Sequence, residues 1–126
     1  MRLLLDTHVV LWHLGGQRQL GDGARAAIAA AEELAFSVVS FAEIGVKAGV
    51  GKLTVPDDLD THVANAGIRV LGLSAGHGLA VAHLPLHHRD PFDRLLVAQA
   101  REEGYALLSA DRRMRAYDVP VLDPLT

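Results

Sequence analysis

Two carboxylates and two arginines stand close together in the segment from His88 to Arg94, HRDPFDR. Asp90 can cap a helix there, because its side chain can accept a backbone N–H bond, and Pro91 suits the first helical position. Asp93 then lies in the first turn, where the helix dipole favours a negative charge. A helix start explains most of this segment, but it does not require a second acid flanked by arginines.

Three further acids, Asp6, Glu43 and Asp111, stand at comparable junctions after short apolar segments. If folding brings them to Asp93, their charges repel one another unless some are protonated or a cation is present. Mg²⁺, or Mn²⁺ in its place, suits such a pocket because hard cations take oxygen ligands. A site of this kind activates a bound water and stabilises charge during phosphodiester hydrolysis. The residues therefore indicate a metal-dependent phosphodiesterase.

Each acid also has a structural explanation. Ser40 and Glu43 match a capping box, in which the glutamate bonds back to the serine backbone. Asp111 can cap a short helix of its own. Asp6 is harder to explain in this way, because a carboxylate directly after three leucines lies near buried apolar surface and needs a partner. Taken singly, Glu43 and Asp111 favour the structural explanation, so the site hypothesis depends on convergence.

The apolar segments predict a parallel α/β sheet whose edge would gather these acids. Strands separated by helical segments favour a parallel sheet covered on both faces, with ligand sites beyond the carboxyl ends of the strands. Four strand candidates and a short edge strand are Leu3–Leu5, Leu34–Val39, Arg69–Leu73, Ala106–Leu108 and Pro120–Leu122. Acids follow the first, second and fourth of these, so we expect all four acids at one end of the sheet.

Helices are predicted between the strands from capping residues and terminal glycines. Asp22 and Ser74 are expected to cap helices, whereas Gly15-Gly16 and Gly104 are expected to end them. The predicted helices cover residues 7–14, 22–31, 40–49, 59–66, 75–81 and 91–104.

The composition fits one domain over residues 1–126 with an aliphatic core, because 50% of the residues are hydrophobic and 5% are aromatic. The absence of cysteine excludes disulfides and thiolate metal sites and suits a cytoplasmic protein, and no apolar run approaches the length of a membrane span. A net charge of -3 excludes a broadly basic nucleic-acid surface. Contact with nucleic acid would therefore be local, through a few basic residues or through metal ions.

Four motifs, in this order and at this spacing, resemble the PIN-domain family, and within it the VapC-like ribonuclease toxins of type II toxin–antitoxin pairs. The motifs are LLLDTHVVLW, SFAEIGVK, HRDPFDRLLVAQA and LLSADRRMRAY. The resemblance covers essentially the whole chain. It implies a three-layer α/β fold with a central, mostly parallel sheet of about four to five short strands flanked by helices.

The resemblance also implies roles for individual residues. Ser109 stands where relatives often carry Thr or Ser and could orient a metal-bound water. Asp90 matches a neighbouring acid that is expected to hold the helix start or Arg89. The family's acidic quartet, which would bind Mg²⁺ or Mn²⁺ and cut RNA, falls on Asp6, Glu43, Asp93 and Asp111.

Basic residues near these acids could contact substrate phosphate or pair with carboxylates. Lys47 lies one helical turn after the glutamate of the quartet, and an ion pair between them is slightly favoured. Arg94 and Arg89 could hold phosphate or Asp90, and for Arg89 a structural pairing has at least equal weight. Arg112 and the arginines after it could form a basic rim, although a solvated helix face is the default.

Seven histidines raise the question of a zinc site. His83, His87 and His88 lie close in sequence, but Pro85 breaks the helical spacing between them and there is no cysteine to serve as a further ligand. A histidine zinc site is therefore disfavoured. His8, beside the first acid, is expected to be a neutral packed side chain.

The leading hypothesis is an endoribonuclease toxin that cuts tRNA or rRNA and is neutralised by a VapB-like antitoxin covering the acidic pocket. The resemblance implies a homodimer, or a hetero-oligomer with the antitoxin. A second hypothesis is a PIN nuclease for RNA maturation or structured DNA outside such a pair. A third is a non-catalytic receiver or RNA-binding module. A receiver has two adjacent acids after its first strand, but here Asp6 is followed by Thr7. A haloacid-type phosphatase has the motif Asp-x-Asp after that strand, but here the third position of the motif is His8.

Overall fold

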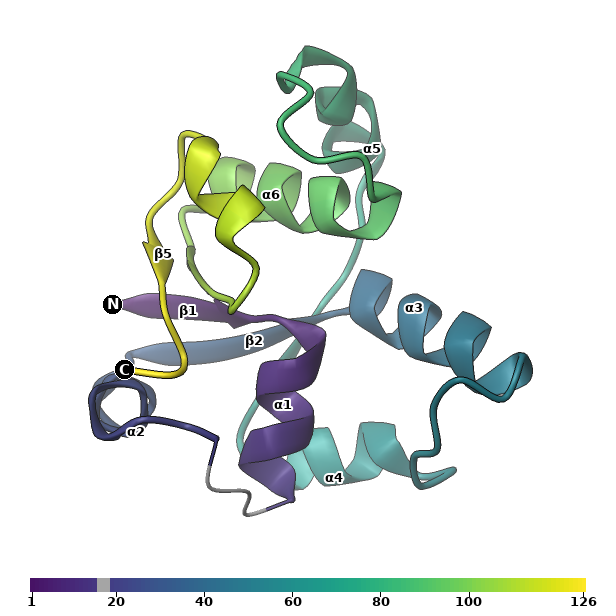
Figure 1. The fold of residues 1–126 in the computed structure, drawn as a ribbon, viewed down its shortest axis with the longest axis vertical. Helices are drawn as coiled ribbons and strands as arrows, with labels where there is room; N and C mark the ends of the chain where they lie inside the picture. The colour runs from purple at the N-terminus through teal and green to yellow at the C-terminus, as the bar shows by residue number, and fades with distance from the viewer. Residues whose placement is uncertain (16–18) are drawn as a thin grey trace.

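The computed structural model describes residues 1–15 and 19–126 as a central sheet with helices on both faces (Figure 1). All strand pairs are parallel, and the order of the strands is β3-β2-β1-β4-β5. The strands are β1 (Arg2–Leu5), β2 (Glu33–Ser37), β3 (Arg69–Leu71), β4 (Ala106–Leu108) and β5 (Val121–Leu122). The predicted α/β class, with a parallel sheet of four to five short strands flanked by helices, is confirmed.

The central position of β1 in the sheet explains the apolar run Leu3–Leu5. Leu3 and Leu5 pack into the core on one face of the sheet, and Leu4 packs into the core on the other, as the alternation of side chains along a strand requires. All three leucines are completely buried. A strand that is covered on both faces has no polar side, so a charged residue can stand only at its ends. Asp6 stands at the carboxyl end of β1.

The helices divide between the two faces, with α1, α2 and α4 on one side and α5 and α6 on the other (Figure 1). None of the helices described is long and apolar enough to cross a membrane. Ser74 caps α5 and Gly104, with φ 75°, ends α6, both as predicted, whereas Gly16 lies outside the described residues. The helices are α1 (Thr7–Leu14), α2 (Asp22–Ala30), α3 (Val38–Gly49), α4 (Leu59–Asn65), α5 (Ala75–Ala80) and α6 (Pro91–Glu103), with 3₁₀ helices at Val81–His83 and Arg112–Ala116.

Helix α3 begins earlier than the sequence predicted. The side chain of Ser37 accepts the backbone N–H of Val39, so this serine caps the helix and strand β2 ends there. Ser40 consequently lies inside the helix, and the capping-box explanation of Glu43 is wrong. Val38 and Val39 favour a strand by their side chains, but the Ser37 cap starts the helix at Val38. Asp22 is likewise the first residue of α2 and not its cap.

Gln99 joins helix α6 to the sheet through a fully buried side chain. Its Oε1 accepts the hydroxyl proton of Ser37, and its Nε2 donates to the carbonyl of Gly72 at 3.2 Å. The Ser37 hydroxyl is also completely buried. A buried hydroxyl without an acceptor costs free energy, so this amide contributes to how firmly α6 is held over β2.

The substitution Gln99→Leu is therefore expected to lower the free energy of unfolding by roughly 2–3 kcal/mol, since it leaves a buried hydroxyl and a carbonyl unpaired. Urea denaturation followed by circular dichroism measures the change. Glu102→Leu, on the exposed face of the same helix, is the matched control and should change stability by less than about 0.5 kcal/mol. Equal effects of the two substitutions would contradict this role for Gln99.

Candidate active site at the carboxyl edge of the sheet

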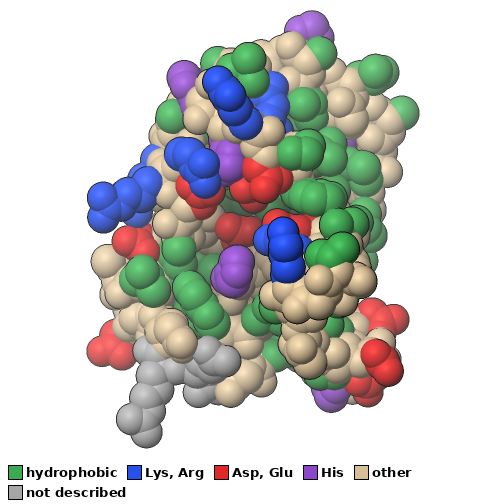
Figure 2. Space-filling view, turned by 45° about the vertical axis from the view of Figure 1, so that its right-hand side comes forward, with side chains coloured by type: hydrophobic (Ala, Val, Ile, Leu, Met, Phe, Trp, Pro, Cys, Tyr) green, Lys and Arg blue, Asp and Glu red, His purple; other side chains and the backbone are tan. Residues whose placement is uncertain are grey.

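Four acids meet in one pocket of about 430 Å³. Asp6 directly follows β1 and Asp111 lies just beyond β4, and these two strands are parallel neighbours, so they end at the same edge. Glu43 comes from α3 and Asp93 from the first turn of α6. In Figure 2 acidic side chains gather in a hollow, with basic side chains and histidine around it. The predicted convergence of the four acids is confirmed.

Asp6 is held at both of its carboxylate oxygens. Oδ1 accepts the N–H of Thr7 at 2.7 Å, and Oδ2 accepts the hydroxyl proton of Ser109 at 2.7 Å. Burial raises the pKa of Asp6, while the bonds from Ser109 and Thr7 act in the opposite direction. Ser109 was expected to orient a metal-bound water. Its hydroxyl is completely buried, donates to Asp6 and accepts the N–H of Asp111, so it fixes two of the four acids, and the role toward a bound water stays a prediction.

Glu43 is also anchored at both oxygens. The hydroxyl of Thr7 donates to Oε1 at 2.7 Å, and Nζ of Lys47 lies 3.0 Å from Oε2. This confirms the predicted ion pair one helical turn apart, and the bond to Glu43 raises the pKa of Lys47. Thr7 is buried and contacts two acids, a role that the sequence analysis missed.

Asp93 lies where negative charges crowd together in the pocket. Burial, followed by the charges of Asp6, Asp90 and Glu43, raises its pKa to about 7 against the opposing effect of His88. A carboxyl group that holds its proton near neutral pH marks a place where negative charge is crowded. A donor set of carboxylate oxygens with this excess of negative charge fits a divalent, oxygen-preferring cation.

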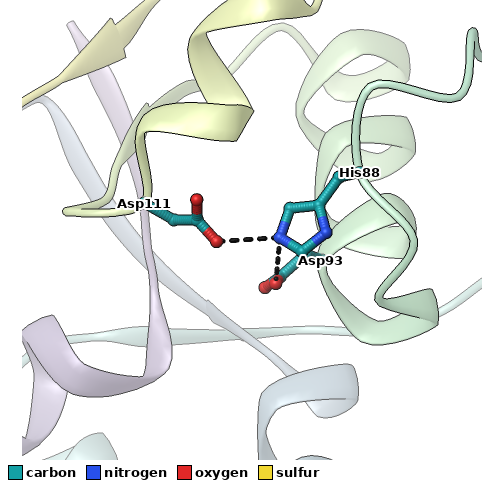
Figure 3. Close-up of side chains that lie close together, drawn as sticks. All are labelled: His88, Asp93 and Asp111. Carbon is teal, nitrogen blue, oxygen red and sulfur yellow. Dashed lines mark hydrogen bonds and ion pairs between the residues drawn. The ribbon is translucent and has the colours of Figure 1, made fainter.

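His88 bridges two of the acids and was not predicted as a site residue. Its Nε2 lies 2.9 Å from Oδ2 of Asp93 and 2.8 Å from Oδ2 of Asp111, as Figure 3 shows. The ring is buried, with 3% of its side chain exposed. Spacing along the chain groups His88 with His83 and His87, but those two histidines are exposed. Within the described residues, His88 instead clusters with the two aspartates.

Asp111 both caps a helix and lines the pocket. Its Oδ1 accepts the N–H of Arg113, the first turn of the 3₁₀ helix, as the structural explanation predicted. Burial raises its pKa, but hydrogen bonds from Arg113 and His88 outweigh that effect, and the net pKa is lowered. Arg112 and Arg113 are both exposed, and of the two Arg113 forms an ion pair with Asp111. Asp111 therefore caps the 3₁₀ helix and lines the acidic pocket at the same time.

The remaining predicted residues surround the start of α6. Asp90 caps the helix, because its Oδ1 accepts the N–H of Phe92 at 2.8 Å and of Asp93 at 3.3 Å. Arg89 is exposed, and the part of the chain that is described shows no ion pair of Asp90 with Arg89 or Arg94. The guanidinium of Arg94 donates instead to the Tyr117 hydroxyl and to the carbonyls of Val81, Leu84, Pro85 and His88.

The fold and the pocket define an α/β protein with a carboxylate site at the carboxyl edge of a parallel sheet, and the model of the PIN domain matches residues 3–120. The chain belongs to the PIN-domain family. It is 31% identical over 126 residues to Ribonuclease VapC22 of Mycobacterium tuberculosis (strain ATCC 25618 / H37Rv), covering 94% of this chain and 93% of that protein. The predicted resemblance to the VapC-like members of the family is confirmed.

Solved structures share the fold at lower sequence identity. VapBC2 from Rickettsia felis, bound to a DNA fragment from their promoter, matches with a TM-score of 0.70 and 14% identity, over 97% of this chain and 98% of that chain. FitAcB from Neisseria gonorrhoeae matches with a TM-score of 0.66 and 20% identity, over 97% of each chain. At these identities the matches support the fold.

Proposed function

We propose that the protein is a Mg²⁺- or Mn²⁺-dependent endoribonuclease toxin. The observation that carries the proposal is the convergence of four acids, from four separate segments, in one pocket where burial and the neighbouring acids raise the pKa of Asp93 to about 7. A divalent ion bound there would supply an activated water and stabilise charge on the phosphodiester. The residues that would hold the ion are Asp6, Glu43, Asp93 and Asp111.

The other side chains of the pocket have positioning roles in this proposal. Thr7 and Ser109 hold Glu43 and Asp6 in fixed orientations, so little reorganisation is needed when a cation binds. Lys47 lies at the pocket with about two-fifths of its side chain exposed, and its ammonium can face a substrate phosphate. RNA is favoured as the substrate because the relative with 31% identity is named a ribonuclease.

A protein antitoxin of the VapB kind is the proposed partner, because the structural relatives include complexes titled VapBC2 and toxin–antitoxin complex. An apolar groove of about 500 Å³ adjoins the acidic pocket, and His8 and Trp12 line both. A peptide segment lying in this groove would reach the acids. The homodimer implied by the family resemblance stays a prediction, which light scattering of the purified protein would measure.

The direct test is an RNA cleavage assay with protein freed of any antitoxin, in Mg²⁺, Mn²⁺ or EDTA. Wild-type protein is expected to give discrete products that require metal, and Asp6→Asn and Glu43→Gln should abolish them. Asp58→Asn, an exposed acid outside the pocket, is the control and should cleave normally. Cleavage that persists in EDTA or in both pocket variants would refute the mechanism. Parallel reactions with structured DNA test the second hypothesis. Cleavage of that DNA would favour a PIN nuclease outside a toxin–antitoxin pair, and cleavage of RNA alone favours the toxin.

Metal affinity is expected to increase with pH through about 7. A cation competes with the proton on Asp93, whose pKa is raised to about 7, so below that pH each unit should weaken Mn²⁺ binding by roughly tenfold if one proton is displaced. Titration of Mn²⁺ by electron paramagnetic resonance at pH 6, 7 and 8 measures this dependence. An affinity that is constant over this range would contradict the assignment of the proton to the site.

A further inference from the structure

His88 lies where a third ligand to the proposed metal would lie. Its Nε2 and one oxygen each of Asp93 and Asp111 lie within 4.8 Å of one another. A histidine in this position can act in two ways. It can bind the metal through the lone pair of Nε2, or it can donate an Nε2–H proton to the carboxylates and so fix their positions.

The other ring nitrogen decides between these roles. Nδ1 of His88 accepts the backbone N–H of Asp90 at 3.1 Å. A backbone amide nitrogen is only a donor, so Nδ1 must carry its lone pair, and the proton of the neutral ring is on Nε2. The Nε2–H then donates to Oδ2 of Asp111 at 2.8 Å, and Oδ2 of Asp93 lies 2.9 Å from the same nitrogen. A protonated Nε2 has no lone pair to give to a metal.

The backbone of His88 is held as firmly as its ring. Its N–H donates to the Tyr117 hydroxyl at 2.9 Å, and its carbonyl accepts from Arg94 at 3.3 Å. Tyr117 is itself buried. These bonds fix the backbone of the loop, and the buried ring is held in turn by the bond from the Asp90 N–H to Nδ1, so the donor arrangement is a property of this loop.

We propose that His88 is a positioning residue, and not a ligand, for the metal of the proposed nuclease site on which this inference rests. Its Nε2–H bonds to Asp111 and lies beside Oδ2 of Asp93, so its positive hydrogen between the two carboxylates partly offsets their repulsion. The metal then meets oxygen donors alone. A site of that kind favours Mg²⁺ and Mn²⁺ and lacks the imidazole that would favour Zn²⁺.

Pulsed electron paramagnetic resonance of the Mn²⁺-loaded protein tests the ligand set directly. The spectrum is expected to show no nitrogen nucleus coupled at ligand distance. Strong coupling to a histidine nitrogen that disappears in His88→Gln would overturn the proposal. A wild-type protein that binds no Mn²⁺ at all would instead refute the proposed metal site, so the two failures are distinguishable.

Two variants test the positioning role through Mn²⁺ affinity. In His88→Gln an amide N–H takes the place of Nε2–H, so the affinity should stay within about threefold of wild type. In His88→Asn the side-chain oxygen can still accept the Asp90 N–H, but no donor reaches the carboxylates, and the affinity should fall by about 10- to 100-fold. Thermal melts confirm that both variants are folded. Equal losses in the two variants, or no loss in either, would contradict the proposal.

Discussion

The substitution Asp93→Asn is expected to reduce RNA cleavage by at least about a hundredfold and, at the same time, to stabilise the metal-free protein. In the proposed mechanism Asp93 is a charged ligand, so its loss would weaken a metal contribution of several kcal/mol to the transition state, and each 1.4 kcal/mol or so is about a factor of ten in rate. Most substitutions that destroy a site by damaging the fold also lower stability. An opposite effect on activity and stability therefore separates a functional carboxylate from a structural one.

The sign of the stability effect follows from the raised pKa of Asp93. In the unfolded chain the carboxyl ionises near 3.8, whereas burial and neighbouring acids raise its pKa to about 7 in the folded protein. Between these values the folded state binds more protons, so stability decreases as pH rises. Above pH 7 the cost of ionising Asp93 is present in full. Asparagine never ionises, so the variant avoids that cost at pH 8 and gains little at pH 4.

The measurement is the melting temperature in EDTA at pH 5, 7 and 8. The variant should melt higher than wild type by roughly 2–6 °C at pH 8, and the difference should shrink toward pH 5. Added Mn²⁺ should raise the melting temperature of the wild type and not that of the variant, because ligand binding stabilises the folded state. Asp118→Asn, an exposed acid, is the control and should shift neither value. A variant that is less stable at pH 8 would contradict the role of Asp93.

The position of the acids was predictable because it depends on topology alone. Once helices alternate with strands, the carboxyl ends of the strands share one edge, and Asp6 and Asp111 stand at two of those ends. Glu43 was placed correctly even though the start of its helix was not, since a shift of two or three residues in the helix start leaves its first two turns near the same edge. Coarse topology tolerates such errors.

The contacts of Thr7 and His88 could not be predicted in the same way. Each contact joins residues that are distant in sequence. The contact of Thr7 with Glu43 depends on how α1 lies against α3, and that of His88 with Asp111 depends on how the loop before α6 is folded. A buried histidine between two carboxylates has no periodic signature. The sequence does place His88 only two and five residues before Asp90 and Asp93. Its closeness to His83 and His87 suggested zinc instead of a contact with these acids.

Arg94 shows the same limit and leads to the second large effect. The sequence suggested that it holds phosphate or Asp90, but its guanidinium donates to four carbonyls and a hydroxyl in the segment before α6. Arg94→Met is expected to lower the free energy of unfolding by roughly 2–4 kcal/mol, because several partly buried acceptors lose a charged donor. Arg94→Lys should restore only part of this, since an ammonium cannot match the planar fork.

Urea denaturation and RNA kinetics together decide what Arg94 does. A structural arginine gives a large loss of stability in Arg94→Met, whereas a phosphate-binding arginine gives unchanged stability and a raised KM. Arg89→Met, in the same segment but exposed, is the matched control and should change stability by less than about 0.5 kcal/mol. If Arg89 contacts substrate phosphate, Arg89→Met should raise the KM for RNA and leave stability unchanged.

The loss of Arg94 should also reach the metal site, because Arg94 holds the carbonyl of His88, and His88 holds Asp93 and Asp111. Mn²⁺ affinity is therefore expected to fall in Arg94→Met even under conditions where the variant is fully folded. Combining Arg94→Met with His88→Asn should weaken Mn²⁺ binding by less than the product of the two single effects, since both act through the same carboxylates. Independent, multiplicative losses would mean that Arg94 influences the metal by another route.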